Sequence, residues 1–269
     1  MKKTIFGLFV AAALIFTVTH PAEAQRGQRG RTQTLRVGVN PVPHGELLEL
    51  VKEDLAKEGI DLQIVTFTDY IQPNSALLSG DLDANYFQHV PYLESNEQWK
   101  RDLSYLWGVH VEPYGLYSAK YKKLSDIPNG ATIAINNDPS NQGRALLLLQ
   151  ANGLIRLNPA SGIRATPRDI ISNPRNLKFR ELEAAQLPRV LQDVDAATIN
   201  GNYALEAGLN PLKDSLAIEG AESLYVNGLV VRRGNENDPR LAALKKVLQS
   251  RKIRNYINSH YNGGVVAAF

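Results

Sequence analysis

The chain has 269 residues, with 30 basic and 27 acidic side chains and no cysteine. Without cysteine, disulfides, a thiolate metal site, a cysteine nucleophile and lipidation on a cysteine are excluded. The nearly balanced charge gives no reason to expect a nucleic-acid partner. A chain of this length can bury a large core, either as one big domain or as two lobes of ordinary size.

Residues 1–24 have the features of a secretory signal peptide. A basic start is followed by an apolar run over residues 5–18 and by small residues that end at Ala24. The apolar run is shorter than the roughly 20 residues that a membrane span needs. We therefore expect cleavage after Ala24 and an exported mature protein. Residues 25–34, with their arginines and glycines, are expected to form a flexible leader.

Strands alternate with helices along the rest of the chain. A strand over residues 34–40 precedes an amphipathic helix over 46–58, and a second strand follows from residue 60. This strand, helix, strand order is typical of parallel pairing. A second unit of the same type has a strand over residues 131–135 and a helix over 141–152. Later expected elements are strands over 177–182, 195–200 and 224–233 and helices over 184–192, 239–248 and 250–261.

Two connections suggest how the chain divides. One runs from Val111 to Tyr121, before the second unit, and the other from Ser223 to Arg233, after it. If both are crossovers, residues 117–226 form an inserted lobe, and residues 35–116 together with 227–269 form the other. The predicted fold class is therefore α/β with two lobes, a ligand cleft between them and closure by a hinge motion.

Aromatic side chains gather in an irregular, polar stretch from Phe67 to Glu94. Tyr70, Phe87, His89 and Tyr92 could enclose an apolar ligand side chain while their polar groups stay hydrogen-bonded. The alternative is that these rings belong to the core of a lobe. The five histidines show no close pairing along the sequence, so no metal site is predicted.

A guanidinium and several amides could bind the polar end of such a ligand. Arg144 follows "PSNQG" at the first turn of the expected helix, where a guanidinium and free backbone N–H groups suit a carboxylate. A surface arginine near a helix start is the alternative. Asn202 and Asn227 end or begin apolar strands, as does Asn200, and their amides suit a zwitterion, although turn positions also favour asparagine.

Catalytic motifs are missing from the sequence. It contains no G-x-S-x-G elbow, no H-E-x-x-H pair and no G-x-x-x-x-G-K-[ST] phosphate loop. An exported enzyme or a surface-interaction protein stays open as an alternative, but the prediction is a protein without enzyme activity and without a cofactor.

Long segments of the chain resemble the NlpA/MetQ family of methionine-binding proteins that serve ABC importers. They include "GVNPVPHGELLELVK", "NDPSNQGRALLLLQANGLI", "ATINGNYALEAGLNP" and "YVNGLVVRRGNENDP", in family order over nearly all of residues 35–260. The resemblance implies a two-lobed periplasmic-binding-protein fold. It also implies that Arg144 holds the ligand carboxylate and that Asn202 and Asn227 hold the groups on the α-carbon. The ligand side chain would be surrounded by Tyr70, Phe87, His89 and Tyr92.

The function implied by this resemblance is capture of L-methionine, or of a close relative, for delivery to an inner-membrane permease and its ATPase. Another amino acid or a methionine-containing dipeptide is the alternative ligand on the same scaffold. Family members are commonly lipoproteins with a cysteine at the end of the signal peptide, where this chain has "HPAEAQ". We therefore expect a freely periplasmic protein without a lipid-anchor cysteine.

Overall fold

The computed structural model describes residues 32–220 and 224–269. The predicted signal peptide and residues 25–31 of the predicted leader lie outside these ranges. The first strand begins at Gln33, two residues inside the segment that was expected to be a leader. No helix in the described residues is both long enough and apolar enough to cross a membrane.

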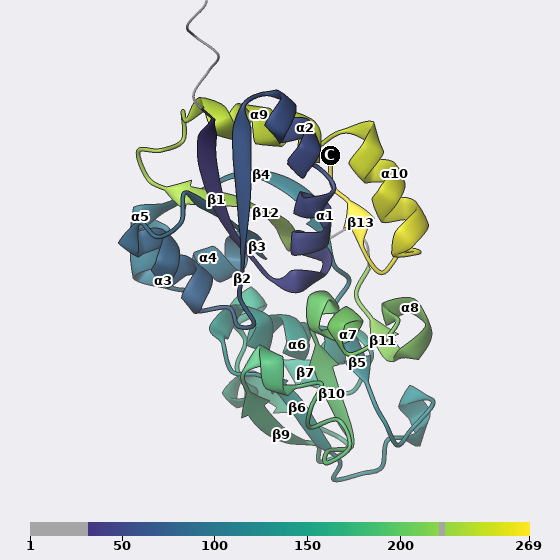
Figure 1. Cartoon of the computed structure of the whole chain (residues 1–269). Helices are drawn as coiled ribbons and strands as arrows, with labels where there is room; N and C mark the ends of the chain where they lie inside the picture. Colours follow the sequence, from purple (N-terminus) through teal and green to yellow (C-terminus); the bar gives the residue numbers. More distant parts are fainter. Residues whose placement is uncertain (1–31, 221–223) are drawn as a thin grey trace, which may run out of the picture. The chain divides into compact units, whose positions relative to one another are not determined.

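The first sheet has six strands, in the order β13-β4-β12-β3-β1-β2 (Figure 1). β1 pairs in parallel with both β2 and β3, whereas β12 is antiparallel to β3 and β4. The strands are β1 (Gln33–Val39), β2 (Ile60–Thr66), β3 (Ala84–His89), β4 (Leu103–Val111), β12 (Val226–Arg232) and β13 (Val266–Ala267). The helical segments that accompany them are η1 (Pro41–Gly45), α1 (Glu46–Glu49), α2 (Lys52–Lys57), α3 (Gln72–Ser79), α4 (Val90–Leu93), α5 (Glu97–Asp102), α9 (Pro239–Leu248) and α10 (Arg251–His260).

Both faces of this sheet are covered by apolar side chains of the helices, as the residues of β12 show. Successive side chains of a strand point to opposite faces. Leu229 and Val231 accordingly belong to one buried cluster, together with apolar residues of α1, α2, α9 and α10. Val230, between them, belongs to a second cluster with Leu77 of α3 and Leu93 of α4. A continuous apolar run in the sequence is therefore a strand buried on both sides.

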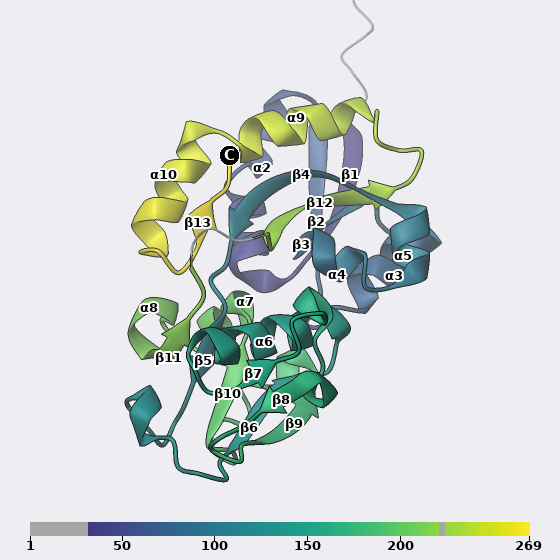
Figure 2. The ribbon, with the colours of Figure 1, turned by 180° about the vertical axis from the view of Figure 1, so that it is seen from behind.

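The second sheet has five strands, in the order β11-β5-β10-β6-β9 (Figure 2). β6 pairs in parallel with β9 and β10, and β5 is antiparallel to β10 and β11. The strands are β5 (Gly115–Tyr117), β6 (Thr132–Asn136), β9 (Lys178–Leu182), β10 (Ala196–Ile199) and β11 (Ser215–Ile218). A separate small ladder joins β7 (Arg156–Leu157) to β8 (Ile170–Ser172). The helical segments here are η2 (Leu124–Asp126), α6 (Pro139–Ala151), η3 (Gly162–Arg164), η4 (Pro167–Asp169), η5 (Ala184–Gln186), α7 (Gly201–Glu206) and α8 (Pro211–Asp214).

The chain passes between the two sheets at two places. Residues 112–114 connect β4 to β5, and residues 219–225 connect β11 to β12. Strands of residues 33–111 and 226–267 thus form one sheet, and strands of residues 115–218, apart from the β7-β8 ladder, form the other. The expected α/β class is confirmed, while lobe boundaries at residues 117 and 226 stay predictions.

Two local expectations were wrong. Residues 184–192 do not form a helix, since only the short η5 and a series of turns occur there. Pro188 contributes to the difference, because it has no backbone N–H to donate to the preceding turn, although Leu187 before it keeps helical backbone. The stretch from Phe67 to Glu94 is not irregular, since α3, the fully buried β3 and α4 occupy most of it.

Candidate ligand-binding site

A cavity lies where β3, α4 and the connection at residues 112–114 meet α6 and α7. Its space is about 340 Å³, a volume that includes open solvent at its mouth. All seven side chains that the sequence singled out line it: Tyr70, Phe87, His89, Tyr92, Arg144, Asn202 and Asn227. The structure therefore brings the whole predicted set together, although ligand binding by these residues stays a prediction.

Arg144 lies in the second turn of α6, one turn later than predicted, because the helix begins at Pro139 and not at Asn141. The side chain of Asp138 caps the helix start by accepting a hydrogen bond from the backbone N–H of Asn141. The guanidinium of Arg144 is 4% exposed, so burial rather than the helix terminus sets its environment.

The guanidinium of Arg144 contacts both connections between the sheets. Its Nη2 atom donates to the backbone oxygen of Glu112 at 3.0 Å and also to the carboxylate of Glu219. Its Nε atom lies 3.1 and 3.2 Å from the two carboxylate oxygens of Glu219. Its carbon Cζ stacks 4.0 Å from the ring centre of Tyr225. These contacts use one side of the guanidinium fork, and Nη1 makes no hydrogen bond within the described residues.

Asn202 joins the two sides of the cavity. Its side-chain oxygen accepts a hydrogen bond from the Tyr70 hydroxyl at 2.6 Å. Its backbone N–H donates to Oε2 of Glu112 at 2.7 Å. Its buried Nδ2 atom has no hydrogen-bond partner in the part of the chain that the structure describes. A buried donor without a partner is costly, and a ligand oxygen in the cavity would satisfy this one.

The aromatic wall comes mainly from β3 and α4. The ring centre of Tyr70 lies 6.0 Å from that of Phe87 and 5.7 Å from that of Tyr92. His89 accepts a hydrogen bond at Nδ1 from the backbone N–H of Tyr92. Burial, with a smaller effect from the positive charge of Arg144, lowers the pKa of His89 to about 3. The imidazole is therefore neutral at pH 7 and serves as a polar aromatic surface.

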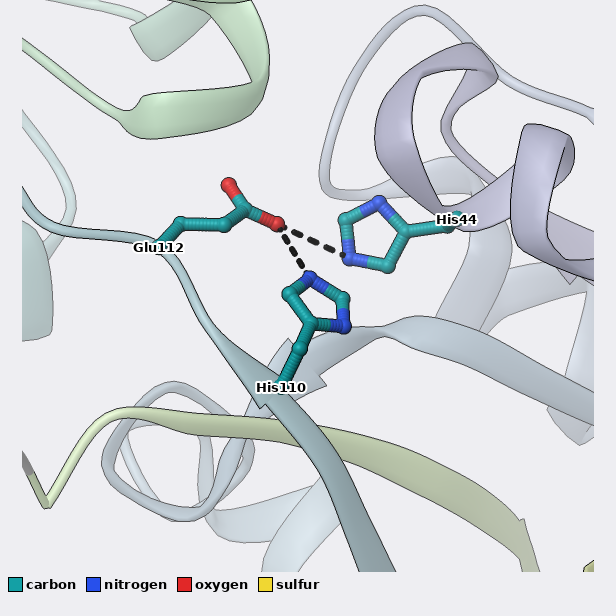
Figure 3. Close-up of side chains that lie close together, drawn as sticks. All are labelled: His44, His110 and Glu112. Atoms are coloured by element: carbon teal, nitrogen blue, oxygen red, sulfur yellow. Dashed lines mark hydrogen bonds and ion pairs between the residues drawn. The ribbon is translucent and has the colours of Figure 1, made fainter. Parts of the chain in front are cut away.

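A cluster of His44, His110 and Glu112 adjoins the cavity (Figure 3). Oε1 of Glu112 lies 2.8 Å from Nε2 of His110 and 3.3 Å from Nε2 of His44. The same nitrogen of His44 lies 3.2 Å from Oδ1 of Asn227. His44 and His110 are far apart in the sequence, but their ring centres lie 4.9 Å apart in the structure.

Two observations weigh against a metal ion in this cluster. Ligand atoms of a tetrahedral zinc, with bonds of about 2.0–2.1 Å, lie roughly 3.3 Å apart, which is more than the 2.8 Å between His110 and Glu112. A metal-binding histidine almost always donates its second ring N–H, yet Nδ1 of His44 has no partner among the described residues. The geometry fits a hydrogen-bonded carboxylate better than a metal centre, so we propose no metal here.

Sequence reasoning missed Glu112, the buried carboxylate of the cavity. Glu112 stands immediately after β4 in "VEPYG", and the only signal was its position in a predicted connection. Gly201 makes its approach to α7 possible, because a Cβ atom at Gly201 would lie 2.6 Å from Cβ of Glu112. The burial of Glu112 depends on this contact between elements that are far apart in the sequence.

Comparison with known proteins places the chain in a family. The model of the family described as NlpA lipoprotein matches residues 35–269. The chain belongs to the NlpA lipoprotein family. Within this family, it is 48% identical to membrane lipoprotein TpN32 of Treponema pallidum, over 88% of this chain and 89% of that protein. The resemblance seen in the sequence is thereby confirmed.

Solved structures of related proteins agree with the fold. A nutrient-binding protein from Burkholderia cenocepacia, bound to methionine, is 46% identical with a TM-score of 0.84, over 87% of this chain and all of that one. A periplasmic substrate-binding protein of an ABC transporter from Coxiella burnetii is 44% identical with a TM-score of 0.82, over 87% of this chain and all of that one. The predicted two-lobed fold of NlpA-family binding proteins is confirmed.

The predicted localisation was wrong. The matching family is one of lipoproteins, and the Treponema relative is a membrane lipoprotein, which contradicts a freely periplasmic protein without a lipid anchor. The prediction rested on the absence of cysteine from the printed sequence. Membership of a lipoprotein family outweighs that single absence, so free diffusion is not inferred for this NlpA-family chain.

Proposed function

We propose that this protein binds methionine, or a close relative, in the cavity and delivers it to an ABC importer without catalysing a reaction. The observation that carries the proposal is the pair of buried opposite charges, Arg144 and Glu112, at one end of a cavity whose wall is aromatic. An α-amino acid has opposite charges on neighbouring groups and a side chain that leaves from the same carbon. The site is complementary to all three parts.

Each part of the ligand has a partner in the proposed pose. The carboxylate is bound by Nη1 of Arg144 and by Nδ2 of Asn202, which have no hydrogen-bond partner within the described residues. The ammonium group faces Glu112, whose pKa is held below its usual value by His44 and by hydrogen bonds from His110 and Asn202, although burial acts in the opposite direction. Glu112 is therefore ionised at pH 7.

The apolar end of the ligand faces Tyr70, Phe87 and Tyr92. A thioether sulfur gains about 0.3–1.5 kcal/mol from a good aromatic contact, which favours methionine over an aliphatic side chain of equal length. The relative bound to methionine in its solved structure supports this choice, and the relative from an ABC transporter supports the delivery step. A methionine-containing dipeptide or another apolar amino acid is the alternative ligand.

Calorimetric titration tests the proposal. The purified protein is unfolded and refolded to remove retained ligand, and is then titrated with L-methionine, D-methionine and a methionine dipeptide in parallel. We expect one-to-one binding of L-methionine. A nanomolar dissociation constant corresponds to a binding free energy of about −12.3 kcal/mol. Methionine has roughly nine non-hydrogen atoms, and a limit of about −1.5 kcal/mol for each atom permits this value. If only the dipeptide or another amino acid binds, that compound replaces methionine as the proposed ligand. If none of these compounds binds, the proposal is overturned.

A further inference from the structure

The carboxylate of Glu112 is contacted from three directions, by two hydrogen bonds and by the ring of His44. Oε1 is hydrogen-bonded to Nε2 of His110 at 2.8 Å and lies 3.3 Å from Nε2 of His44 (Figure 3). Oε2 accepts a hydrogen bond from the backbone N–H of Asn202. An ionised carboxylate offers about four lone-pair directions. Three are used by these contacts, which leaves about one for a ligand in the cavity that Glu112 lines.

The tautomer of His110 follows from its two neighbours. An ionised carboxylate can only accept, so the ring nitrogen Nε2, 2.8 Å away, must carry the hydrogen. The other nitrogen, Nδ1, is then an acceptor, and the hydroxyl of Tyr86 donates to it at 2.5 Å. Burial raises the pKa of Tyr86 well above its usual value, so this hydroxyl keeps its proton. Tyr86 therefore donates a hydrogen bond to His110, and His110 donates one to Glu112.

His44 constrains the carboxylate from the other side. Its Nε2 atom lies between two acceptors, Oε1 of Glu112 at 3.3 Å and Oδ1 of Asn227 at 3.2 Å, and so must carry the ring hydrogen. Burial lowers the pKa of His44 to about 4, despite the opposing effect of Glu112. At pH 7 this ring is a neutral donor. Its N–H is hydrogen-bonded to Asn227, so the ring limits the position of the Glu112 carboxylate by contact and does not cancel the negative charge that an ammonium group needs.

Neither histidine ring lines the cavity itself, and both are at most 1% exposed. His44 lies in η1 and His110 in β4, so the ordered six-stranded sheet holds both rings. Glu112, by contrast, belongs to the connection between the sheets. We propose that His44 and His110 are positioning residues that aim the free lone pair of Glu112 at the ligand's amino group, so that the site selects ligands with a free α-amino group. This inference rests on the proposed function.

A comparison of two ligands isolates the positioning role. L-methionine is compared with 4-(methylthio)butanoate, which has the same carboxylate and thioether but no amino group. His110→Phe removes the ring N–H and keeps an aromatic ring, whereas His110→Gln keeps an N–H donor near the position of Nε2. We expect His110→Phe to weaken methionine binding about tenfold, as loss of a hydrogen bond to a charged group does, and to leave the analogue unchanged. His110→Gln should restore most of the methionine affinity.

The outcomes separate this inference from the proposed function. Equal weakening of both ligands by His110→Phe, or no weakening of either, would overturn the positioning role while methionine binding by the wild-type protein stands. Absence of methionine binding by the wild-type protein would overturn the proposed function and this inference with it. Circular dichroism and thermal unfolding of the ligand-free variants check the fold. If His110→Phe does not fold, His44→Leu paired with His44→Gln is subject to the same test.

Discussion

Arg144 shows how a single side chain can serve two partners. Nε and Nη2 of its fork are used by Glu219 and by the backbone oxygen of Glu112, while Nη1 would bind the ligand carboxylate in the proposed pose. The planar guanidinium can make these contacts at once, but a lysine ammonium is a point charge that cannot span them. Arg144→Lys should therefore weaken methionine binding about 10- to 100-fold, measured by calorimetry, with the charge retained.

The control for this substitution is Arg251→Lys, at an exposed position in α10. It makes the same chemical change far from the cavity and should leave the affinity as it is. Unchanged affinity in Arg144→Lys would mean that the ligand carboxylate does not use the guanidinium fork, and the assignment of Arg144 would then fail.

Residues of the site differ in how visible they are in the sequence. Arg144 and the aromatic residues stand out because their chemistry is unusual for the segments that contain them. His44, His110 and Glu112 give no such signal, because His44 follows β1, whereas the other two end or follow β4. In the sheet, β4 and β1 are separated by β12 and β3, yet the rings of His44 and His110 lie 4.9 Å apart. Periodicity along one strand contains no information about that arrangement.

Among the elements, α6 depends on a glycine in its middle. A Cβ atom at Gly143 would lie 2.1 Å from the backbone oxygen of Ile163 in η3. Alanine is the better helix former by about 1 kcal/mol, but this clash involves backbone that cannot move aside freely. Gly143→Ala should lower the free energy of unfolding by about 1–3 kcal/mol, measured by urea denaturation.

Gly220→Ala is the control, because among the described residues no atom beyond its chain neighbours lies within 4 Å of a Cβ built there, and its φ is outside the left-handed region. Its stability should stay within about 0.5 kcal/mol of the wild-type value. A stabilising effect of Gly143→Ala would show that helix propensity outweighs the contact with η3.

Sequence periodicity identified most of the elements but not their interruptions. The strands at β6 and β12 were predictable because apolar residues fill both faces. The helix expected over residues 46–58 is instead two pieces, α1 and α2, separated at Leu50 and Val51. Leu47, Leu48, Val51 and Leu55 are all buried, so the apolar pattern is satisfied by packing on the sheet with or without the break. Periodicity alone cannot distinguish one continuous helix from two shorter ones.

For the whole molecule, buried ionisable groups link stability to pH. The pKa of His44 is lowered to about 4 and that of His89 to about 3, mainly by burial. In the unfolded chain a histidine titrates near 6.5. Between these values the unfolded state binds more protons, so the free energy of unfolding falls as the pH falls below about 6.5. Glu206 acts in the opposite direction, because partial burial raises its pKa to about 7 and the folded state then binds the extra proton.

Comparison of variants separates these opposing contributions to the stability of the ligand-free protein. Urea denaturation at several pH values from 4.5 to 6.5 gives the slope of the free energy of unfolding against pH. His89→Gln removes one proton taken up on unfolding, so this slope should decrease by about 1.4 kcal/mol per pH unit at the acidic end of the window, where an unfolded histidine is fully protonated. Glu206→Gln removes the opposing group and should make the slope steeper. If His89→Gln keeps the wild-type slope, folding does not lower the pKa of His89, and burial is not what keeps this ring neutral beside Arg144.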